Sequence, residues 1–321
     1  MKRRVVFSMV CVVMAAALLW WGVRPVPSQQ AEVASESIAL VLDTDIGTGA
    51  LQIKQGAKLA AKEQKVDLLT AAPDYAGGTV ISQAELIGTL LQKNVKAIVL
   101  VPAAGEQLDD ALALAEEMKV PVLSLGGASL PGKVACTISD DFVQGGQMAG
   151  RALLARVPSP GSIVLITGGQ DDAEAALRLR GAMDAFIGVK ALTVVKQITD
   201  TDLTADTLLT LLADFGDING VLCLTANSTE IAAKAASRYG QDLCIVGIDC
   251  GQNRTTYLEN RQVDAMVLGM PFAMGYLGVQ FAAQAMQGKE LPNSYSTESR
   301  VIDLDNMYLP ENQKLAFPML Q

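Results

Sequence analysis

The residue types that most often perform catalysis are scarce or badly spaced in this chain of 321 residues. It contains no histidine, which removes the commonest general base and the commonest transition-metal ligand. The adjacent carboxylates Asp109-Asp110, Asp140-Asp141 and Asp171-Asp172 do not converge on a helix or strand, so we interpret them as solvated side chains or helix N-caps. No G-x-S-x-G sequence is present. We therefore expect no catalytic residue, no metal site and no enzymatic activity.

Two glycine-containing segments come close to cofactor-binding motifs without completing them. The segment 47–52 ends in Gln52 where the dinucleotide fingerprint G-x-G-x-x-G requires its last glycine. The segment 127–134 ends in Val134 where a phosphate loop requires a magnesium-binding serine or threonine. We expect surface turns at both places and no cofactor.

The cysteines carry no metal or redox motif. The chain has 5 cysteines and no C-x-x-C pair, which excludes zinc ribbons and thioredoxin-like sites. Cys223 and Cys244 fall within two apolar runs and are interpreted as small core residues. A disulfide between them in an oxidising compartment is the alternative.

The overall composition places the chain among folded proteins that do not bind nucleic acid. Half of the residues are apolar and 18% are charged, which excludes a disordered chain. The formal charge of −9 argues against a nucleic-acid partner, because such proteins present a basic face.

The N-terminus has the pattern of an export segment. Residues 2–4 are basic and precede an apolar run over 5–23 that includes Trp20-Trp21. This run is longer than the roughly 7–15-residue core of a signal peptide and close to the roughly 20 residues that span a bilayer. We expect 1–25 to be an uncleaved membrane helix, with a cleaved signal or a buried helix as alternatives. The Pro- and Ser-containing segment 26–36 is expected to be a linker.

The rest of the chain alternates short apolar runs with amphipathic stretches, in two similar series. The runs are near-continuous, as in parallel strands covered on both faces. Strands are expected to begin near Ile38, Val66, Ala97, Pro121 and Ala135, and again near Ser162, Ala191, Gly220, Leu243 and Asp264. The fold class is therefore α/β, with two doubly wound parallel-sheet lobes and a ligand cleft at the carboxyl ends of the strands.

Several local strings, in their order and spacing, resemble one protein family. They are IALVLDTD (38–45), VKAIVLVP (95–102), SDDFVQGGQMAG (139–150), RLRGAMDAF (178–186) and IVGIDCG (245–251). The exported part resembles the type I periplasmic solute-binding proteins, especially the ribose-binding group. The resemblance implies two lobes joined by a three-strand hinge that closes on a ligand.

The resemblance also implies how the chain is divided. The N-terminal lobe would take 37–140 and 270–298, the C-terminal lobe would take 141–269 and 299–310, and 311–321 would be a tail. The implied function is extracytoplasmic capture of a small polar, sugar-like ligand for the membrane permease of an ABC importer. The alternative is a sensing module for a membrane kinase or chemoreceptor.

The resemblance transfers three ligand-binding positions to this chain. Arg178 begins an R-x-x-G stretch, and its rigid fork of donors suits vicinal hydroxyls. Asp249 ends the strand IVGID, where a carboxylate accepts hydrogen bonds from a polyol. Asn227 is either a ligand-binding amide or the N-cap of the next helix.

The sequence departs from the family in the aromatic residues that stack on a sugar. Gly49 and Ala50 stand where ribose-type relatives place paired aromatics, and Thr201 replaces a third aromatic. Asp43 and Asp45 instead bring negative charge to the rim of the cleft on the N-terminal lobe. We interpret them either as acceptors of ligand hydrogen bonds or as caps of the next helix. These departures leave room for a larger, more hydrophilic or cationic ligand.

Overall fold

The computed structural model describes residues 36–73, 81–103, 105–127, 130, 134–239 and 242–317. The expected membrane helix over 1–25 and nearly all of the expected linker over 26–36 lie outside these residues. No helix within the described ranges is long and apolar enough to cross a membrane.

The first lobe is built on a six-stranded sheet in the order β11-β5-β4-β3-β1-β2, in which every neighbouring pair is parallel. The apolar runs of β1, β3 and β4 are buried, as expected for strands covered on both faces. The strands span β1 Ser37–Val41, β2 Asp67–Ala71, β3 Ala97–Leu100, β4 Val122–Leu125, β5 Cys136–Asp140 and β11 Ser294–Thr297.

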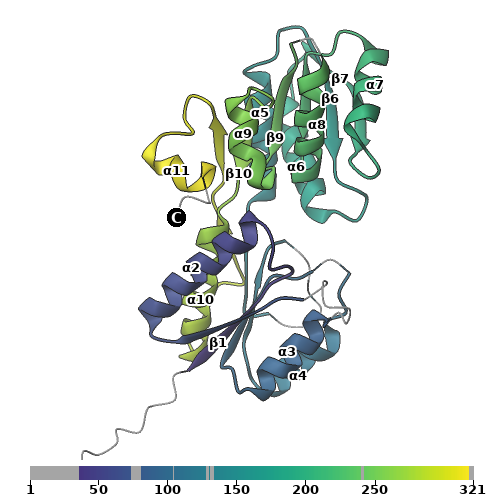
Figure 1. Cartoon of the computed structure of the whole chain (residues 1–321). Helices are drawn as coiled ribbons and strands as arrows, with labels where there is room; N and C mark the ends of the chain where they lie inside the picture. The colour runs from purple at the N-terminus through teal and green to yellow at the C-terminus, as the bar shows by residue number, and fades with distance from the viewer. Residues whose placement is uncertain are drawn as a thin grey trace, which may run out of the picture. The chain divides into compact units, whose positions relative to one another are not determined.

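Helices cover the two faces of this sheet in pairs (Figure 1). Side chains of α2 and α10 form one core with the sheet, and side chains of α3 and α4 form a second core on its other face. The helices span α2 Thr48–Gln64, α3 Gln83–Gln92, α4 Asp109–Glu117 and α10 Pro271–Met286.

Glycines allow α2 and α10 to approach closely. A methyl group on Gly56 would collide with the carbonyl of Phe272, and one on Gly275 would collide with the carbonyl of Ile53. The two helices therefore meet backbone to backbone, and larger residues at these positions would force them apart.

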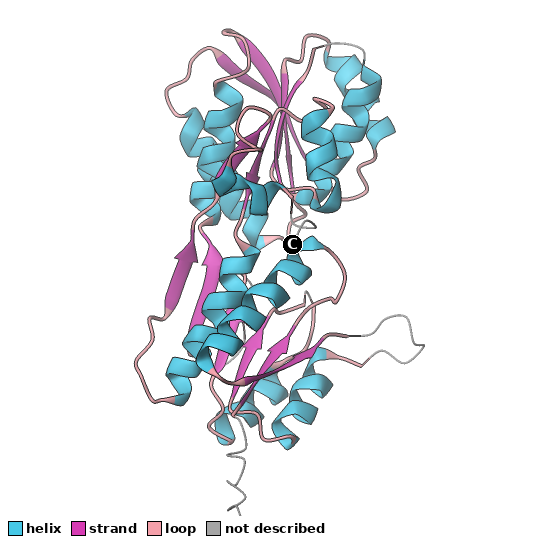
Figure 2. Cartoon of the chain, turned by 60° about the vertical axis from the view of Figure 1, so that its left-hand side comes forward, coloured by secondary structure: helices cyan, strands magenta, loops and turns pink. Residues whose placement is uncertain are grey.

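The second lobe repeats this plan, with helices on both faces of its sheet (Figure 2). Its strand order is β12-β10-β9-β8-β6-β7. Its edge strand β12 is antiparallel to β10, whereas the other neighbouring pairs are parallel. The strands span β6 Gly161–Thr167, β7 Leu192–Thr199, β8 Gly220–Cys223, β9 Cys244–Ile248, β10 Ala265–Leu268 and β12 Arg300–Asp303. The helices span α5 Phe142–Leu154, α6 Ala173–Phe186, α7 Ala205–Phe215, α8 Ala226–Tyr239, α9 Arg254–Glu259 and α11 Pro310–Ala316, with a 3₁₀ turn η1 at Gly251–Asn253. The two parallel-sheet lobes predicted from the sequence are therefore present.

Cys223 and Cys244 lie on neighbouring strands, but on opposite faces of the second sheet. Gly220 of β8 is paired with Cys244 of β9, so Cys223 is three residues further along and points the other way. Cys223 packs in the core with α7 and α8, whereas Cys244 packs against the core formed with α5 and α6. Both are free thiols, and the disulfide alternative is wrong because the sheet itself separates the two sulfurs.

The chain passes between the lobes at three crossings, after β5, after β10 and between β11 and β12. Asp140, at the first crossing, accepts hydrogen bonds from the backbone N–H of Met270 and from Thr297 Oγ1. It packs on Gly269, where a methyl group would collide with the carboxylate. One carboxylate thus contacts all three crossings.

Candidate ligand-binding site

The polar residues expected to bind ligand follow the carboxyl ends of strands in both lobes. Asp43 and Asp45 follow β1 in the first lobe. In the second lobe, Asn227 lies in the first turn of α8 after β8, and Asp249 follows β9. Arg178 reaches the same edge from α6. Ligands of doubly wound sheets bind beyond this edge.

Arg178 is largely buried and keeps donors available. Its side chain is 16% exposed, and Nη2 donates to Glu174 Oε2 at 3.0 Å. Nη1 lies 3.4 Å from the carbonyl oxygen of Leu224, just beyond β8. The guanidinium lies over the ring of Phe142, with 4.8 Å between Cζ and the ring centroid. Because a guanidinium has five N–H donors, these contacts orient Arg178 without using all of them.

The packing of α6 against α5 fixes the backbone of Arg178. A methyl group on Gly146 would collide with the Arg178 carbonyl, and one on Gly181 would collide with the Val143 carbonyl. Asp172 caps α6 by accepting from the N–H of Ala175 at 2.8 Å. The helix is thus held at both its start and its middle, so Arg178 projects from a rigid support.

Glu174 connects this cluster to the first lobe. Its Oε1 accepts a hydrogen bond at 3.1 Å from the backbone N–H of Gly127, which follows β4. A side chain at Gly127 would collide with the ring of Phe142. The glycine therefore allows the end of β4 to approach the residues around Arg178. Phe142 and Glu174 were not anticipated from the sequence, because both look like ordinary helix residues there.

Asp249 is held in a fixed geometry by its neighbours. Its Oδ1 accepts from the N–H groups of Cys250 at 2.6 Å and Gly251 at 2.9 Å, and its backbone has a φ of 41°. Its Oδ2 accepts from Arg254 Nη2 at 2.9 Å. The side chain remains 32% exposed. A carboxylate has about four acceptor positions, so Asp249 retains capacity for a ligand hydroxyl.

Arg254 is the residue that sequence reasoning missed most completely. It is 2% exposed and begins the short helix α9 five positions after Asp249. No local pattern distinguishes it from a surface arginine, because two of its acceptors, in Thr48 and Leu315, are distant in sequence.

Asn227 is not a helix cap. Thr225 Oγ1 accepts from the N–H of Ser228 at 3.0 Å, and Ser228 Oγ accepts from the N–H of Thr225 at 3.1 Å. Thr225 therefore caps α8, and Asn227 is exposed in the first turn, where the N-cap alternative is wrong. Asn227 Nδ2 lies 3.3 Å from Asp200 Oδ2, which also accepts from Thr225 Oγ1 at 2.6 Å. Asp200, after β7, is a further polar residue at this edge that the sequence did not single out.

Asp43 and Asp45 differ in their surroundings, and neither caps α2. Helix α2 begins after Gly47 without a side-chain cap among the described residues. Asp43 is half-buried and accepts from the N–H of Thr44 at 2.9 Å, and burial raises the pKa of its carboxyl. Asp45 is 66% exposed and pairs with Lys54 at 2.6 Å.

Gln83 positions the loop that carries Asp43. Its buried amide donates to the carbonyls of Leu42 at 2.8 Å and Val101 at 2.7 Å. Its Oε1 accepts from the N–H of Ala103 at 2.9 Å. One side chain therefore joins the ends of β1 and β3 and satisfies backbone groups that the sheet leaves unpaired.

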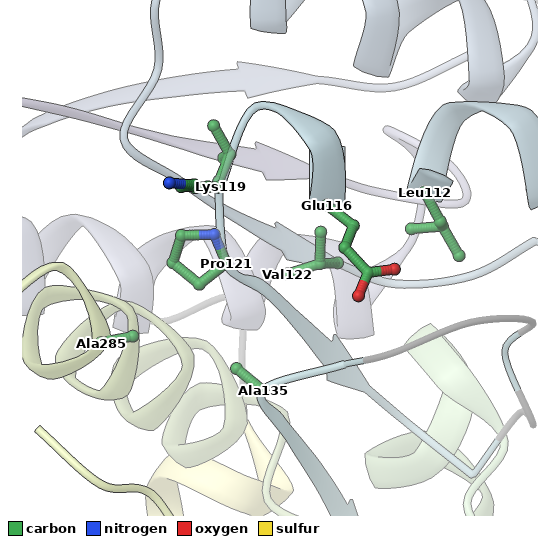
Figure 3. Close-up of a pocket in the computed structure, with 8 residues that line it drawn as sticks. Leu112, Glu116, Lys119, Pro121, Val122, Ala135 and Ala285 are labelled. Atoms are coloured by element: carbon green, nitrogen blue, oxygen red, sulfur yellow. The ribbon is translucent and has the colours of Figure 1, made fainter. Parts of the chain in front are cut away.

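Two cavities lie away from these residues. One of 330 Å³ is at the amino ends of β4 and β5, where Pro121, Val122, Ala135 and Ala285 meet Glu116 and Lys119 (Figure 3). Another, of 510 Å³, is lined by Asn219, Leu243 and Asp264 near the amino ends of the second sheet's strands. Both are at the edges opposite to the candidate site.

The comparisons with known proteins match the chain across both lobes. A model of the periplasmic binding protein domain matches residues 38–290. The chain belongs to the type I periplasmic binding protein family. The ribose import binding protein RbsB of Haemophilus influenzae is 24% identical to this periplasmic binding protein over 273 residues, which cover 84% of this chain and 92% of RbsB. RbsB of Bacillus subtilis is 25% identical over 84% of this chain and 88% of its own.

The solved structures support the same fold for this periplasmic binding protein. An ABC transporter solute-binding protein from Agrobacterium vitis, bound with α-D-tagatopyranose, has a TM-score of 0.74 at 22% identity. The match covers 87% of this chain and 98% of that protein.

Proposed function

We propose that this periplasmic binding protein captures a small polyhydroxylated ligand, a sugar or sugar-like molecule, between its two lobes. The observation that carries the proposal is Arg178, whose fork is oriented by Phe142 and Glu174 yet keeps donors for a ligand. Full-length relatives named as ribose import binding proteins support the ligand class.

The proposed roles follow from donor and acceptor chemistry. Arg178 donates to ligand oxygens, Asp249 accepts from ligand hydroxyls, and Asn227 does either. Asp43 supplies an acceptor from the first lobe, and Asp45 adds charge at its rim. Binding requires no covalent step, and the relatives named above are binding proteins rather than enzymes.

We further propose that the protein acts outside the cytoplasm and delivers its ligand to the permease of an ABC importer. The basic and apolar N-terminal segment supports export, and tethering by that segment belongs to the same proposal. Cell fractionation together with the N-terminal sequence of the mature protein tests this point. A cytoplasmic protein would contradict export, and a mature N-terminus beyond residue 25 would contradict tethering by this helix.

Thermal unfolding with a panel of carbohydrates tests ligand binding. The panel takes D-ribose, D-allose, D-arabinose, D-tagatose and xylitol, the molecules named for relatives and solved structures. A ligand at one hundred times its Kd stabilises the folded state by about 2.7 kcal/mol, which gives a readily measured rise in Tm. Arg178→Ala is expected to reduce the rise strongly, whereas Arg180→Ala, an exposed control on the same helix, should preserve it. Absence of any rise across the panel, followed by absence of calorimetric binding, would refute the ligand class.

A further inference from the structure

Arg254 is a buried arginine whose acceptors belong to three different parts of the fold. Its Nη2 donates to Asp249 Oδ2 at 2.9 Å and lies 3.2 Å from Thr48 Oγ1. Its Nη1 donates to the Leu315 carbonyl at 2.8 Å, and its Nε donates to the Gly251 carbonyl at 2.9 Å. A buried guanidinium is tolerated when its donors are satisfied, and these contacts engage four of its five N–H groups.

These acceptors connect the candidate site to both lobes. Asp249 follows β9 and Leu315 lies in α11, so both belong to the second lobe. Thr48 is the first residue of α2 in the first lobe and is 4% exposed. The Arg254–Thr48 contact is therefore a polar connection between lobes that begins at a proposed ligand-binding carboxylate.

We propose that Arg254 is a positioning residue that couples ligand binding at Asp249 to the contact between the lobes. The proposal rests on the proposed function, because it takes Asp249 as a ligand acceptor. A guanidinium is planar, so the directions of its N–H groups are fixed relative to one another. A guanidinium held by Asp249, Gly251 and Leu315 thus presents its remaining Nη2 hydrogen to Thr48 in one direction only.

The first lobe receives this contact on a rigid element. Thr48 begins α2, and α2 meets α10 backbone to backbone at Gly56 and Gly275. A shift of Thr48 therefore moves the helix pair rather than one side chain. Ligand that holds Asp249 in place favours the lobe arrangement in which the Thr48 contact forms.

Thr48→Val in the full chain tests the connection, because it removes the hydroxyl while keeping the side-chain shape. Loss of one hydrogen bond to a charged donor is expected to weaken D-ribose binding by at least about tenfold. Small-angle scattering of the ligand-free variant is expected to show a larger radius of gyration than the wild type. Thr255→Val is the matched control: it removes the bond from Thr255 Oγ1 to the Ala316 carbonyl and leaves Thr48 intact. It should keep wild-type affinity and scattering.

Variants at Arg254 itself separate coupling from a purely structural role. Arg254→Lys keeps the charge beside Asp249 but lacks the fork, so binding should fall as in Thr48→Val. Its Tm should also fall, because the carbonyls of Gly251 and Leu315 lose their donors. Arg254→Met should in addition release α11, seen as faster proteolysis within 310–317. If Arg254→Met fails to fold, the comparison of Thr48→Val with the wild type and Thr255→Val still tests whether the Arg254–Thr48 contact affects ligand binding.

The outcomes distinguish this inference from the proposed function. If wild-type protein binds no sugar of the panel, the proposed function fails, but the ligand-free scattering comparison still tests the Arg254–Thr48 connection. Wild-type scattering and wild-type D-ribose affinity in Thr48→Val would overturn the inference even though sugar binding stands.

Discussion

Thr297 Oγ1 donates a hydrogen bond to Asp140 Oδ1, and this pair joins the first crossing between the lobes to the third. The N–H of Met270, at the second crossing, lies 3.4 Å from the same oxygen. Burial raises the pKa of the Asp140 carboxyl above its ordinary value of 3.8. The hinge is therefore held by a carboxylate whose charged form is disfavoured by its surroundings.

The pH dependence of stability should change in Asp140→Asn. The pKa of Asp140 is raised in the folded state, so its protonated carboxyl stabilises the wild type fully below pH 3.8. This contribution to the free energy of unfolding is lost as the pH rises through the raised pKa. The asparagine cannot ionise, so the variant does not lose this contribution. The free energy of unfolding of Asp140→Asn minus that of the wild type should therefore increase between pH 3.8 and the raised pKa, and then level off. Urea denaturation at pH values from below 3.8 to neutral measures this, and parallel curves for the two proteins would contradict it.

Arg178→Ala should weaken sugar binding by about ten- to one-hundredfold, because it removes charge-assisted hydrogen bonds worth about 1.5–3 kcal/mol. Arg178→Lys should recover only part of the affinity, since an ammonium group lacks the planar fork. Isothermal titration calorimetry of the D-ribose complex measures both. Arg180→Ala, exposed on the same helix, is the control. Equal losses in the Arg178 and Arg180 variants would exclude the assigned role.

Gly181→Ala should destabilise the protein by about 1–3 kcal/mol, because its methyl group would force α5 away from α6. Gly88→Ala is the matched control, since a methyl group there meets no atom within 4 Å in helix α3. It should stabilise the protein by about 0.5–1 kcal/mol through lower backbone entropy in the unfolded chain. Denaturant midpoints distinguish the two. An unchanged denaturant midpoint in Gly181→Ala would mean that α5 and α6 can separate without loss of stability, which would contradict the prediction.

The cysteines of the second lobe should stay reduced under oxidising conditions. Cys223 and Cys244 point to opposite faces of the sheet, and burial raises the pKa of the Cys244 thiol to about 12 and that of Cys223 further. Both effects oppose disulfide formation and alkylation. Mass spectrometry of the native protein after iodoacetamide treatment should find Cys223 unmodified. A tryptic fragment linking Cys223 to Cys244 would contradict the structure.

The sequence was sufficient to predict most strands of the two sheets, because they are short, near-continuous apolar runs that alternate with amphipathic stretches. The helices between the strands were likewise anticipated, because they are amphipathic stretches. The resemblance placed the strand within 299–310 in the second lobe, but it predicted neither the antiparallel direction of β12 nor the helix α11, because both depend on pairing and packing with distant segments.

The candidate site was predictable only where a residue belongs to a local string. Arg178 and Asp249 were recognised within R-x-x-G and IVGID. Arg254 was missed because the two acceptors that link it to other parts of the fold, Thr48 and Leu315, are far away in sequence. The pair Asp140-Asp141 was interpreted as surface or capping residues, which holds for Asp141, the N-cap of α5, but is wrong for Asp140, which is buried at the crossings.

The close glycine contacts between helices also determine how a rotation at the crossings is transmitted. The first crossing leads into α5, which is locked to α6, and the second leads into α10, which is locked to α2. Each of these helices is therefore fixed to its own lobe, so we expect a rotation at the crossings to move each lobe as a rigid body. Arg178 on α6 and Thr48 on α2 are fixed to different lobes in this way, so we expect a change of backbone angle near Asp140 to change the distance between them.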